Sequence, residues 1–280
     1  MTDIRVWVDG ARVPADAPAV SAVDHGVTVG DGAFETAKVE DGVPFALGRH
    51  LARMDRTIAG LGLPAADHDR VREGVAAVLE GPPMPFGRLR WTVTAGRGPL
   101  GSDRLDSALT YIVTAVEQAR PAASGRVVTV PWVRNERSAT VGLKTTSYAE
   151  NVVALARAAE QGAIEALFAN TRGELCEGTG CNVFVVTDGV LRTPALDSGC
   201  LAGISRALVI EWSREDGLDV VEETLPLEVL AEADEVFITS SVKDVMPVSA
   251  VDGRALEAPG PVTAAVREVW ARHAARTAEP

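Results

Sequence analysis

Strand-like and helix-like patterns alternate irregularly along this chain, with short hairpins between them. Two Asp-Gly turns, Asp9-Gly10 and Asp41-Gly42, each join a pair of strand-like runs, and this dipeptide is a strong hairpin signal. Apolar residues at helical spacing follow the second turn, at Leu51, Met54 and Ile58. A barrel of equal βα units would show a regular alternation instead. The pattern therefore favours an α+β, or mixed α/β, fold.

The rest of the chain follows the same two patterns. Strand-like runs predict strands at residues 4–8, 11–13, 34–40, 43–47, 88–93, 109–116, 127–130, 166–170, 182–186, 190–193, 220–225 and 236–239. Helical spacing predicts helices near residues 51–61, 71–79, 150–161, 204–215 and 262–275.

The length of 280 residues suits two domains. The run 117–125 has no periodicity and contains Pro, Ser and Gly, which makes it the best linker candidate. We expect a first domain at residues 1–118, a linker at 119–125 and a second domain at 126–280.

Charge and composition exclude several classes of partner. The chain has 27 basic and 39 acidic residues, a formal net charge of −12, whereas nucleic acids and anionic membranes attract basic surfaces. No apolar run reaches the roughly 18 residues of a membrane span, and no apolar signal segment opens the chain, so we expect a cytoplasmic location. The three cysteines are too few for a disulfide framework and lack zinc-site spacing, so no metal is expected.

One glycine motif invites a dinucleotide-binding interpretation. Residues Gly96 to Gly101 match GxGxxG after a strand, but a dinucleotide fingerprint must then open a helix. Pro99 lies inside the motif and only a few residues precede the next strand, so a hairpin loop is predicted. Motifs of P-loop enzymes and of serine hydrolases do not occur.

The scarcity of lysine restricts any chemistry that needs an amine nucleophile. Lys38, Lys144 and Lys243 are the only lysines in the chain. Lys144 follows an apolar stretch and precedes a helix, and such surroundings lower the pKa of an amine and make it nucleophilic. From this window alone, a solvated loop lysine remains the alternative.

Four other positions favour a functional interpretation of Lys144 over its window alone. Arg53 lies one turn into a helix, and Gly203-Ile204-Ser205 opens another helix with free N–H groups and a hydroxyl. Ser240-Ser241 ends a strand, and Glu177 lies in a Gly-rich turn between strands. Taken singly, each is equally well explained as an ordinary surface, helix-start or turn residue.

Together these segments resemble the class IV aminotransferases, the fold-type IV enzymes that depend on pyridoxal 5′-phosphate (PLP). The resemblance covers nearly the whole chain and is carried by the segments Gly30–Thr36, His50–Met54, Leu143–Tyr148, Glu177–Phe184, Leu201–Arg206, Ala233–Phe237, Ser240-Ser241 and Pro247-Val248. The family includes branched-chain and D-amino acid aminotransferases, (R)-selective amine transaminases and 4-amino-4-deoxychorismate lyases.

The resemblance assigns roles to the cofactor-binding residues. Lys144 would bond covalently to the PLP aldehyde and carry the proton, and Glu177 would bind the pyridine nitrogen. Tyr148 would bind the ring O3′, and Leu201 would pack on one ring face. The phosphate would be bound by Arg53, Ile204, Ser205 and Ser241.

The resemblance leaves the substrate residues less defined. Phe34 would line the pocket, and Arg97 is the first candidate for a substrate carboxylate. Arg90 and Lys243 compete with Arg97 for this role, and Lys38 is expected to be structural. His25, His68 and His273 have no matching role.

The activity implied is a ping-pong transfer of an amino group from an amino acid or primary amine to a 2-oxo acid. The alternative is 4-amino-4-deoxychorismate lyase, which releases 4-aminobenzoate and pyruvate, because the run 145–152 looks close to such lyases. An inactive PLP-fold binding protein and a nicotinamide oxidoreductase are further alternatives. The resemblance also implies a homodimer, with a smaller N-terminal domain and a larger, PLP-binding C-terminal domain.

Overall fold

A computed structural model of the chain describes residues 4–280 and divides them into two compact units. The first unit contains the described residues up to 120 together with residues 143–148 and 278–280. The second unit contains residues 121–142 and 149–277. Residues 1–3, where the expected first domain and the N-terminal segment begin, lie outside the described residues.

An antiparallel sheet of six strands forms the first unit, in the order β2-β1-β6-β5-β3-β4. The strands are β1 (Ile4–Val8), β2 (Ala11–Val13), β3 (Gly32–Glu40), β4 (Val43–Pro44), β5 (Phe86–Thr94) and β6 (Thr110–Glu117). Both Asp-Gly hairpins are confirmed, because β1 pairs with β2 and β3 pairs with β4. The expected strand at 43–47 is too long, since Ala46 adopts a left-handed backbone (φ 56°) and Leu47 already begins a helix.

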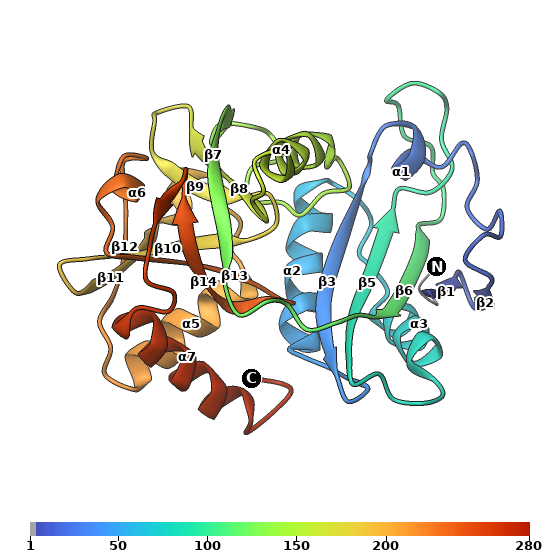
Figure 1. Ribbon diagram of the computed structural model, residues 1–280. Helices are drawn as coiled ribbons and strands as arrows, with labels where there is room; N and C mark the ends of the chain where they lie inside the picture. Colours follow the sequence, from blue (N-terminus) through green and yellow to red (C-terminus); the bar gives the residue numbers. More distant parts are fainter. Residues whose placement is uncertain (1–3) are drawn as a thin grey trace. The chain divides into compact units, whose positions relative to one another are not determined.

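Helices α2 (Leu47–Gly60) and α3 (His68–Leu79) cover the apolar face of this sheet (Figure 1). The short helix α1 (His25–Thr28) contributes no residue to that core. Leu51, Met54 and Ile58 of α2 are buried as their spacing predicts, in a core with Trp7 and Trp91 of the sheet. The Gly96–Gly101 motif lies in the connection between the antiparallel strands β5 and β6 and is followed by no helix, which confirms the hairpin-loop interpretation.

Two segments that are distant in sequence join the first unit. Thr145 forms a β-bridge with Ala33, and the amide of Thr146 donates to the carbonyl of Gly32 at 2.8 Å. At the end of the chain, the Glu279 carboxylate accepts from the amides of Leu47 and Gly48 at 3.1 and 3.0 Å. The start of α2 is therefore capped by a residue more than 200 positions away.

A nine-stranded sheet forms the second unit, in the order β12-β11-β10-β13-β14-β7-β8-β9, with β15 paired to β14. The strands are β7 (Gly125–Arg134), β8 (Glu165–Asn170), β9 (Leu175–Gly178), β10 (Asn182–Thr187), β11 (Val190–Pro194), β12 (Val220–Glu223), β13 (Glu235–Ser240), β14 (Asp244–Val251) and β15 (Arg254–Ala255). The helical segments are α4 (Ala149–Glu160), η1 (Leu196–Ser198), α5 (Ile204–Glu215), α6 (Val229–Glu232) and α7 (Pro261–Ala274).

Aromatic contacts mark the core of the second unit. Phe184 of β10 stacks on Phe237 of β13 with ring centroids 4.7 Å apart. Helices α5 and α7 pack together through Trp212 and Trp270, whose rings are 5.0 Å apart, and they lie side by side in Figure 1.

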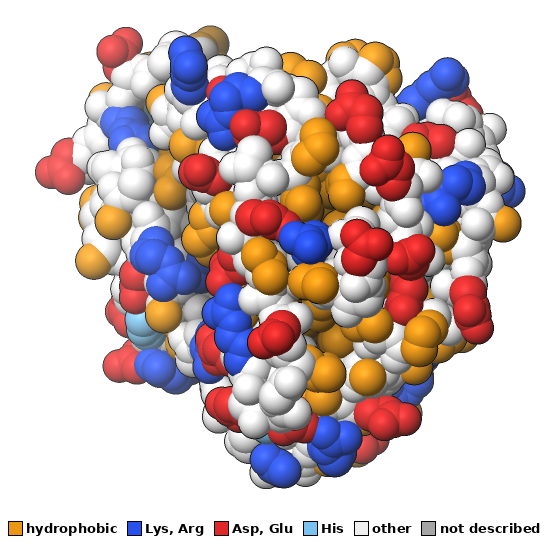
Figure 2. All heavy atoms as spheres, turned by 90° about the vertical axis from the view of Figure 1, so that its left-hand side faces the viewer, with side chains coloured by type: hydrophobic (Ala, Val, Ile, Leu, Met, Phe, Trp, Pro, Cys, Tyr) orange, Lys and Arg blue, Asp and Glu red, His pale blue; other side chains and the backbone are white. Residues whose placement is uncertain are grey.

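Neither a membrane span nor a metal cluster is found within residues 4–280. No described helix is long and apolar enough to cross a bilayer, and no group of three His, Cys, Asp or Glu side chains in this range could hold a metal ion. On the face drawn in Figure 2, acidic and basic side chains are interspersed among apolar ones.

Candidate active site

The backbone around Lys144 is held at three points of the first unit. The Lys144 amide donates to Thr57 Oγ1 of α2 at 3.2 Å, and its carbonyl accepts from the Phe34 amide at 3.1 Å. The Thr146 hydroxyl donates to the carbonyl of Gly30 at 2.7 Å. The lysine therefore lies on an extended segment docked against β3, and not in a solvated loop.

Aromatic rings surround the half-buried Lys144 amine. Lys144 Nζ lies 4.4 Å from the centroid of the Phe34 ring and 5.8 Å from that of Tyr148. These two rings meet edge to face, with centroids 5.2 Å apart. Three of the residues expected at the site are thus brought together in this unit.

Arg90 of β5 also contacts the Phe34 ring, with Cζ 3.7 Å from its centroid. Burial lowers the pKa of the Arg90 guanidinium from its ordinary value, although the group stays charged at neutral pH. Within residues 4–280, no hydrogen bond or ion pair balances that charge. An uncompensated guanidinium beside an amine is an anion-binding feature.

Arg53 of α2 is buried against an acid that sequence reasoning did not single out. Its Nε and Nη2 donate to the two carboxylate oxygens of Glu35 at 2.8 and 2.7 Å. His50 Nδ1 lies 2.7 Å from Glu35 Oε2, on the same carboxylate. Glu35 lies on the face of β3 that α2 covers, and its place one residue after Phe34 was the available signal.

The ionisation of this cluster follows from competing effects. Burial by itself would raise the pKa of Glu35, but the charge and hydrogen bonds of Arg53 and the bond from His50 lower it to about 2. Burial lowers the pKa of His50, and the positive charges of Arg53 and Lys144 lower it further. The hydrogen bond and negative charge of Glu35 raise it, but they do not outweigh these effects. At neutral pH the cluster therefore holds an ionised Glu35, a charged Arg53 and a neutral His50.

In the second unit, Glu177 lies in strand β9 and not in the turn that its glycine-rich surroundings predict. The burial of Leu175 and Cys176 beside it explains the strand. Its Oε2 accepts from the Leu201 amide at 2.9 Å, and Oε1 lies 3.5 Å from Arg134 Nε. The Leu201 amide and the Arg134 guanidinium thus contact this half-buried carboxylate, one on each oxygen.

The start of α5 lies next to strand β10, where Gly203 approaches Asn182. Gly203 is the N-cap and supplies no side-chain cap, so the first amides of the helix have no capping side chain there. A Cβ at Gly203 would collide with Asn182 Oδ1, so only glycine fits this approach. Ser205 is buried, and its hydroxyl makes no hydrogen bond to any residue in the range 4–280.

Strand β13 brings Ser241 to this end of the sheet. Thr239 pairs with Asn182 of β10, whose side-chain amide donates to the Leu201 carbonyl at 2.9 Å. The Thr239 hydroxyl is buried without a hydrogen-bond partner among the described residues. Ser241 follows two residues later, just beyond the end of β13 at Ser240.

The two remaining substrate candidates are engaged differently. Lys243 Nζ lies 3.1 Å from Glu165 Oε2, a buried carboxylate that also accepts from the Thr179 amide at 3.0 Å. Arg97 is exposed in the β5–β6 connection, with Nε 3.5 Å from Ser21 Oγ. The charge of Lys243 is therefore offset by an acid, unlike that of Arg90.

A family model described as Amino-transferase class IV matches residues 32–251. The chain belongs to the class IV aminotransferase family. A protein of Methanocaldococcus jannaschii, provisionally named a branched-chain amino acid aminotransferase, is 33% identical over 261 residues, which are 90% of each chain. An aminodeoxychorismate lyase of Bacillus subtilis is 28% identical over 259 residues, covering 88% of this chain and 86% of the relative.

The fold is also that of the family. A fold IV transaminase of Curtobacterium pusillum superposes with a TM-score of 0.81 at 30% identity, covering 95% of this chain and 98% of that one. Class IV aminotransferases depend on PLP, which supplies an aldehyde and an electron-withdrawing ring. Each unit holds residues that fit this cofactor: the first has an amine among aromatic rings, and the second has a carboxylate and a helix N-terminus with an unpartnered hydroxyl.

Proposed function

We propose that the chain is a PLP-dependent aminotransferase in which Lys144 binds the cofactor and moves the substrate proton. The observation that carries this proposal is the docked Lys144 segment, which holds the amine against Phe34 and Tyr148. The other two lysines are paired with acids, Lys38 with Glu40 and Lys243 with Glu165.

Borohydride reduction of the PLP-loaded protein, followed by peptide mapping, tests this role. We expect the reduced adduct on Lys144, with Lys38 and Lys243 unmodified as internal controls. An adduct on either of those lysines, or none, would refute the proposal.

For the cofactor, we propose Glu177 at the pyridine nitrogen, Tyr148 at O3′ and Leu201 on the ring face. The phosphate would be bound by Arg53, Ile204, Ser205 and Ser241. The bare N-terminus of α5 supports the phosphate assignment, because helix N-termini bind anions. Ser205→Ala should weaken PLP binding about tenfold, the loss of one charge-assisted hydrogen bond, and leave pyridoxal binding unchanged because pyridoxal has no phosphate.

For the substrate carboxylate, the structure favours Arg90 over Arg97 and Lys243, because its charge is uncompensated and it shares the Phe34 ring with Lys144. Arg90→Gln should raise KM for carboxylate donors at least tenfold and spare primary amines without a carboxylate. The same change at Arg97 or Lys243 should have a smaller effect. An unchanged KM in Arg90→Gln would exclude this assignment.

Aminodeoxychorismate lyase is the second candidate, favoured by the Bacillus subtilis relative. The two activities differ in their products. Incubation with aminodeoxychorismate should release no 4-aminobenzoate from an aminotransferase, whereas D- and L-amino acids with 2-oxoglutarate should show amino transfer. The reverse result would establish the lyase.

A further inference from the structure

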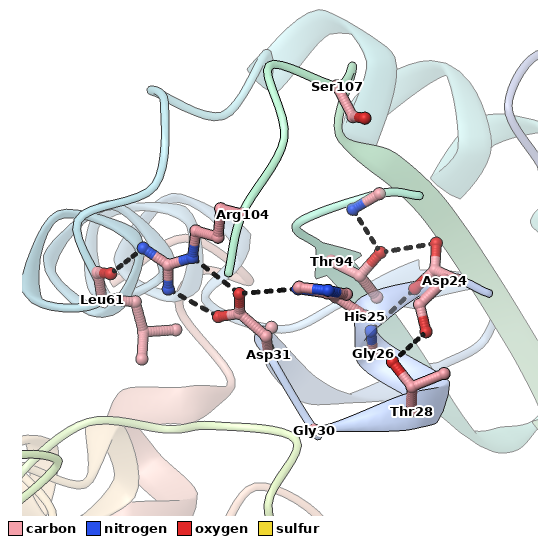
Figure 3. A network of polar contacts seen from close by, with 12 residues as sticks. Asp24, His25, Gly26, Thr28, Gly30, Asp31, Leu61, Thr94, Arg104 and Ser107 are labelled. Carbon is pink, nitrogen blue, oxygen red and sulfur yellow. Dashed lines mark hydrogen bonds and ion pairs between the residues drawn. The ribbon is translucent and has the colours of Figure 1, made fainter. Parts of the chain in front are cut away.

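The guanidinium of Arg104 joins two parts of the first unit, the Gly30–Gly32 turn and the C-terminal end of α2 (Figure 3). Its Nε and Nη2 donate to the two carboxylate oxygens of Asp31, both at 2.7 Å. Its Nη1 donates to the carbonyl of Leu61 at 2.8 Å, at the C-terminal end of α2. A cation is favourable there because the last carbonyls of a helix carry partial negative charge.

Each of the two parts supports the segment that carries Lys144. On one side, Thr57 of α2 accepts the Lys144 amide, and the Leu143 side chain packs against Gly60, where a Cβ would lie 2.7 Å from Leu143 Cδ2. On the other side, Asp31 lies between Gly30 and Gly32.

These two glycines hold the segment through their carbonyls. The Gly30 carbonyl accepts from the Thr146 and Ser147 hydroxyls at 2.7 and 3.1 Å, and the Gly32 carbonyl accepts the Thr146 amide. Arg104 thus links both supports of the Lys144 segment without lying within that segment.

The acid that Arg104 binds is largely buried, at 12% side-chain exposure. The hydrogen bond from Arg104 is the main cause that lowers the pKa of Asp31, against burial, and His25 adds a weaker contact at 3.6 Å. A bidentate guanidinium–carboxylate pair fixes geometry as well as charge. Lysine cannot reproduce it, because an ammonium cannot span Asp31 and Leu61 with a planar fork.

We propose that Arg104 is a positioning residue that fixes the backbone carrying Lys144, by clamping the end of α2 to the Gly30–Gly32 turn. Its importance for catalysis rests on the proposed role of Lys144. The connection between β5 and β6 would then act as a brace for the amine.

Amide hydrogen exchange of the PLP-loaded protein tests the brace directly. In Arg104→Gln, the amides of Phe34, Lys144 and Thr146 should exchange about tenfold faster, because the segment opens locally more often. Arg104→Lys should show an intermediate increase. Asp103→Asn removes a charge from the same loop at an exposed residue and should match the wild type.

Kinetics and a second variant separate positioning from simple tethering. Arg104→Gln should lower kcat about tenfold with little change in KM, since a displaced catalytic group costs rate more than binding. Asp31→Asn removes the partner charge and should accelerate the same three amides, which keeps the test valid if Arg104→Gln fails to fold.

If only the amides of residues 102–107 exchange faster in both variants, the brace is refuted and Arg104 merely tethers the loop. Failure of the proposed function looks different. A borohydride adduct away from Lys144 would remove the catalytic meaning of the brace but leave its exchange pattern intact.

Discussion

Glu35 is ionised although its side chain has no solvent contact. An isolated carboxylate in that position would be protonated, because burial disfavours the charged form. The fork of Arg53 and the imidazole of His50 satisfy both of its oxygens. A single acid thus sets the orientation of the arginine expected to bind phosphate.

Replacing this acid should be costly. Glu35→Gln leaves the Arg53 charge buried without its counter-charge, and we expect the free energy of unfolding to fall by about 3 kcal/mol, as for other broken buried pairs. Urea unfolding monitored by circular dichroism measures it. Glu73→Gln, an exposed acid on α3, is the control and should change stability by less than about 0.5 kcal/mol.

The ionisation of Glu35 has a direct signature in pH. Its folded-state pKa of about 2 lies below the ordinary 4.5, so its stabilisation is complete above pH 4.5 and is lost as the pH falls through 2. In a carbon-13 carboxyl spectrum, the Glu35 resonance, assigned by its absence in Glu35→Gln, should stay flat from pH 7 to about 3. A midpoint near 4 would contradict the structure.

At the scale of elements, α2 depends on the end of the chain. Its N-cap, Ala46, is left-handed and provides no capping side chain, and the carboxylate of Glu279 takes that place. A capping acid at a helix N-terminus satisfies orphan amides and complements the helix dipole.

Glu279→Ala should therefore destabilise the protein by about 1 kcal/mol. Because α2 carries Arg53, affinity for PLP should fall with it. Glu268→Ala, on the exposed face of α7, should change neither quantity. Differential scanning calorimetry and a PLP titration monitor the two effects, and equal stability of the two variants would argue against the cap.

Local signals predicted some elements well. Helices α5 and α7 lie within one residue of expectation, because Gly203, Gly217 and Pro261 mark their ends. No expected strand corresponds to β14, which contains Pro247, a residue that is unusual in a central strand; the structure pairs it with Phe237. Strand β7 runs to Arg134, beyond the expected end at residue 130, and β12 stops at Glu223, before residue 225.

The candidate site was predictable as far as the residue pattern of the family extends. Lys144, Tyr148 and Phe34 meet in one unit, and Glu177, Leu201 and Ser205 in the other. The residues that support the site were not predictable, because they act through long-range pairings that no local pattern encodes. Thr57 accepts from the Lys144 amide, Glu35 binds Arg53, and Arg104 binds Asp31.

At the scale of the whole molecule, we propose a homodimer, as the family resemblance implies. Sedimentation equilibrium at micromolar concentration should give twice the chain mass of 29.4 kDa. Measurement at several salt concentrations distinguishes association through apolar contacts from association through surface charge, since salt screens only the latter. A single-chain mass throughout would exclude the dimer.

The first unit is assembled from three separate stretches of sequence, residues 4–120, 143–148 and 278–280. A chimera that takes only residues 4–120 from a relative would place a foreign β3 and α2 against the original Lys144 segment and the original residues 278–280. Recombination between relatives should therefore succeed only when all three stretches come from the same parent. The first unit would then be exchanged as a whole, although its three stretches are separated in the gene.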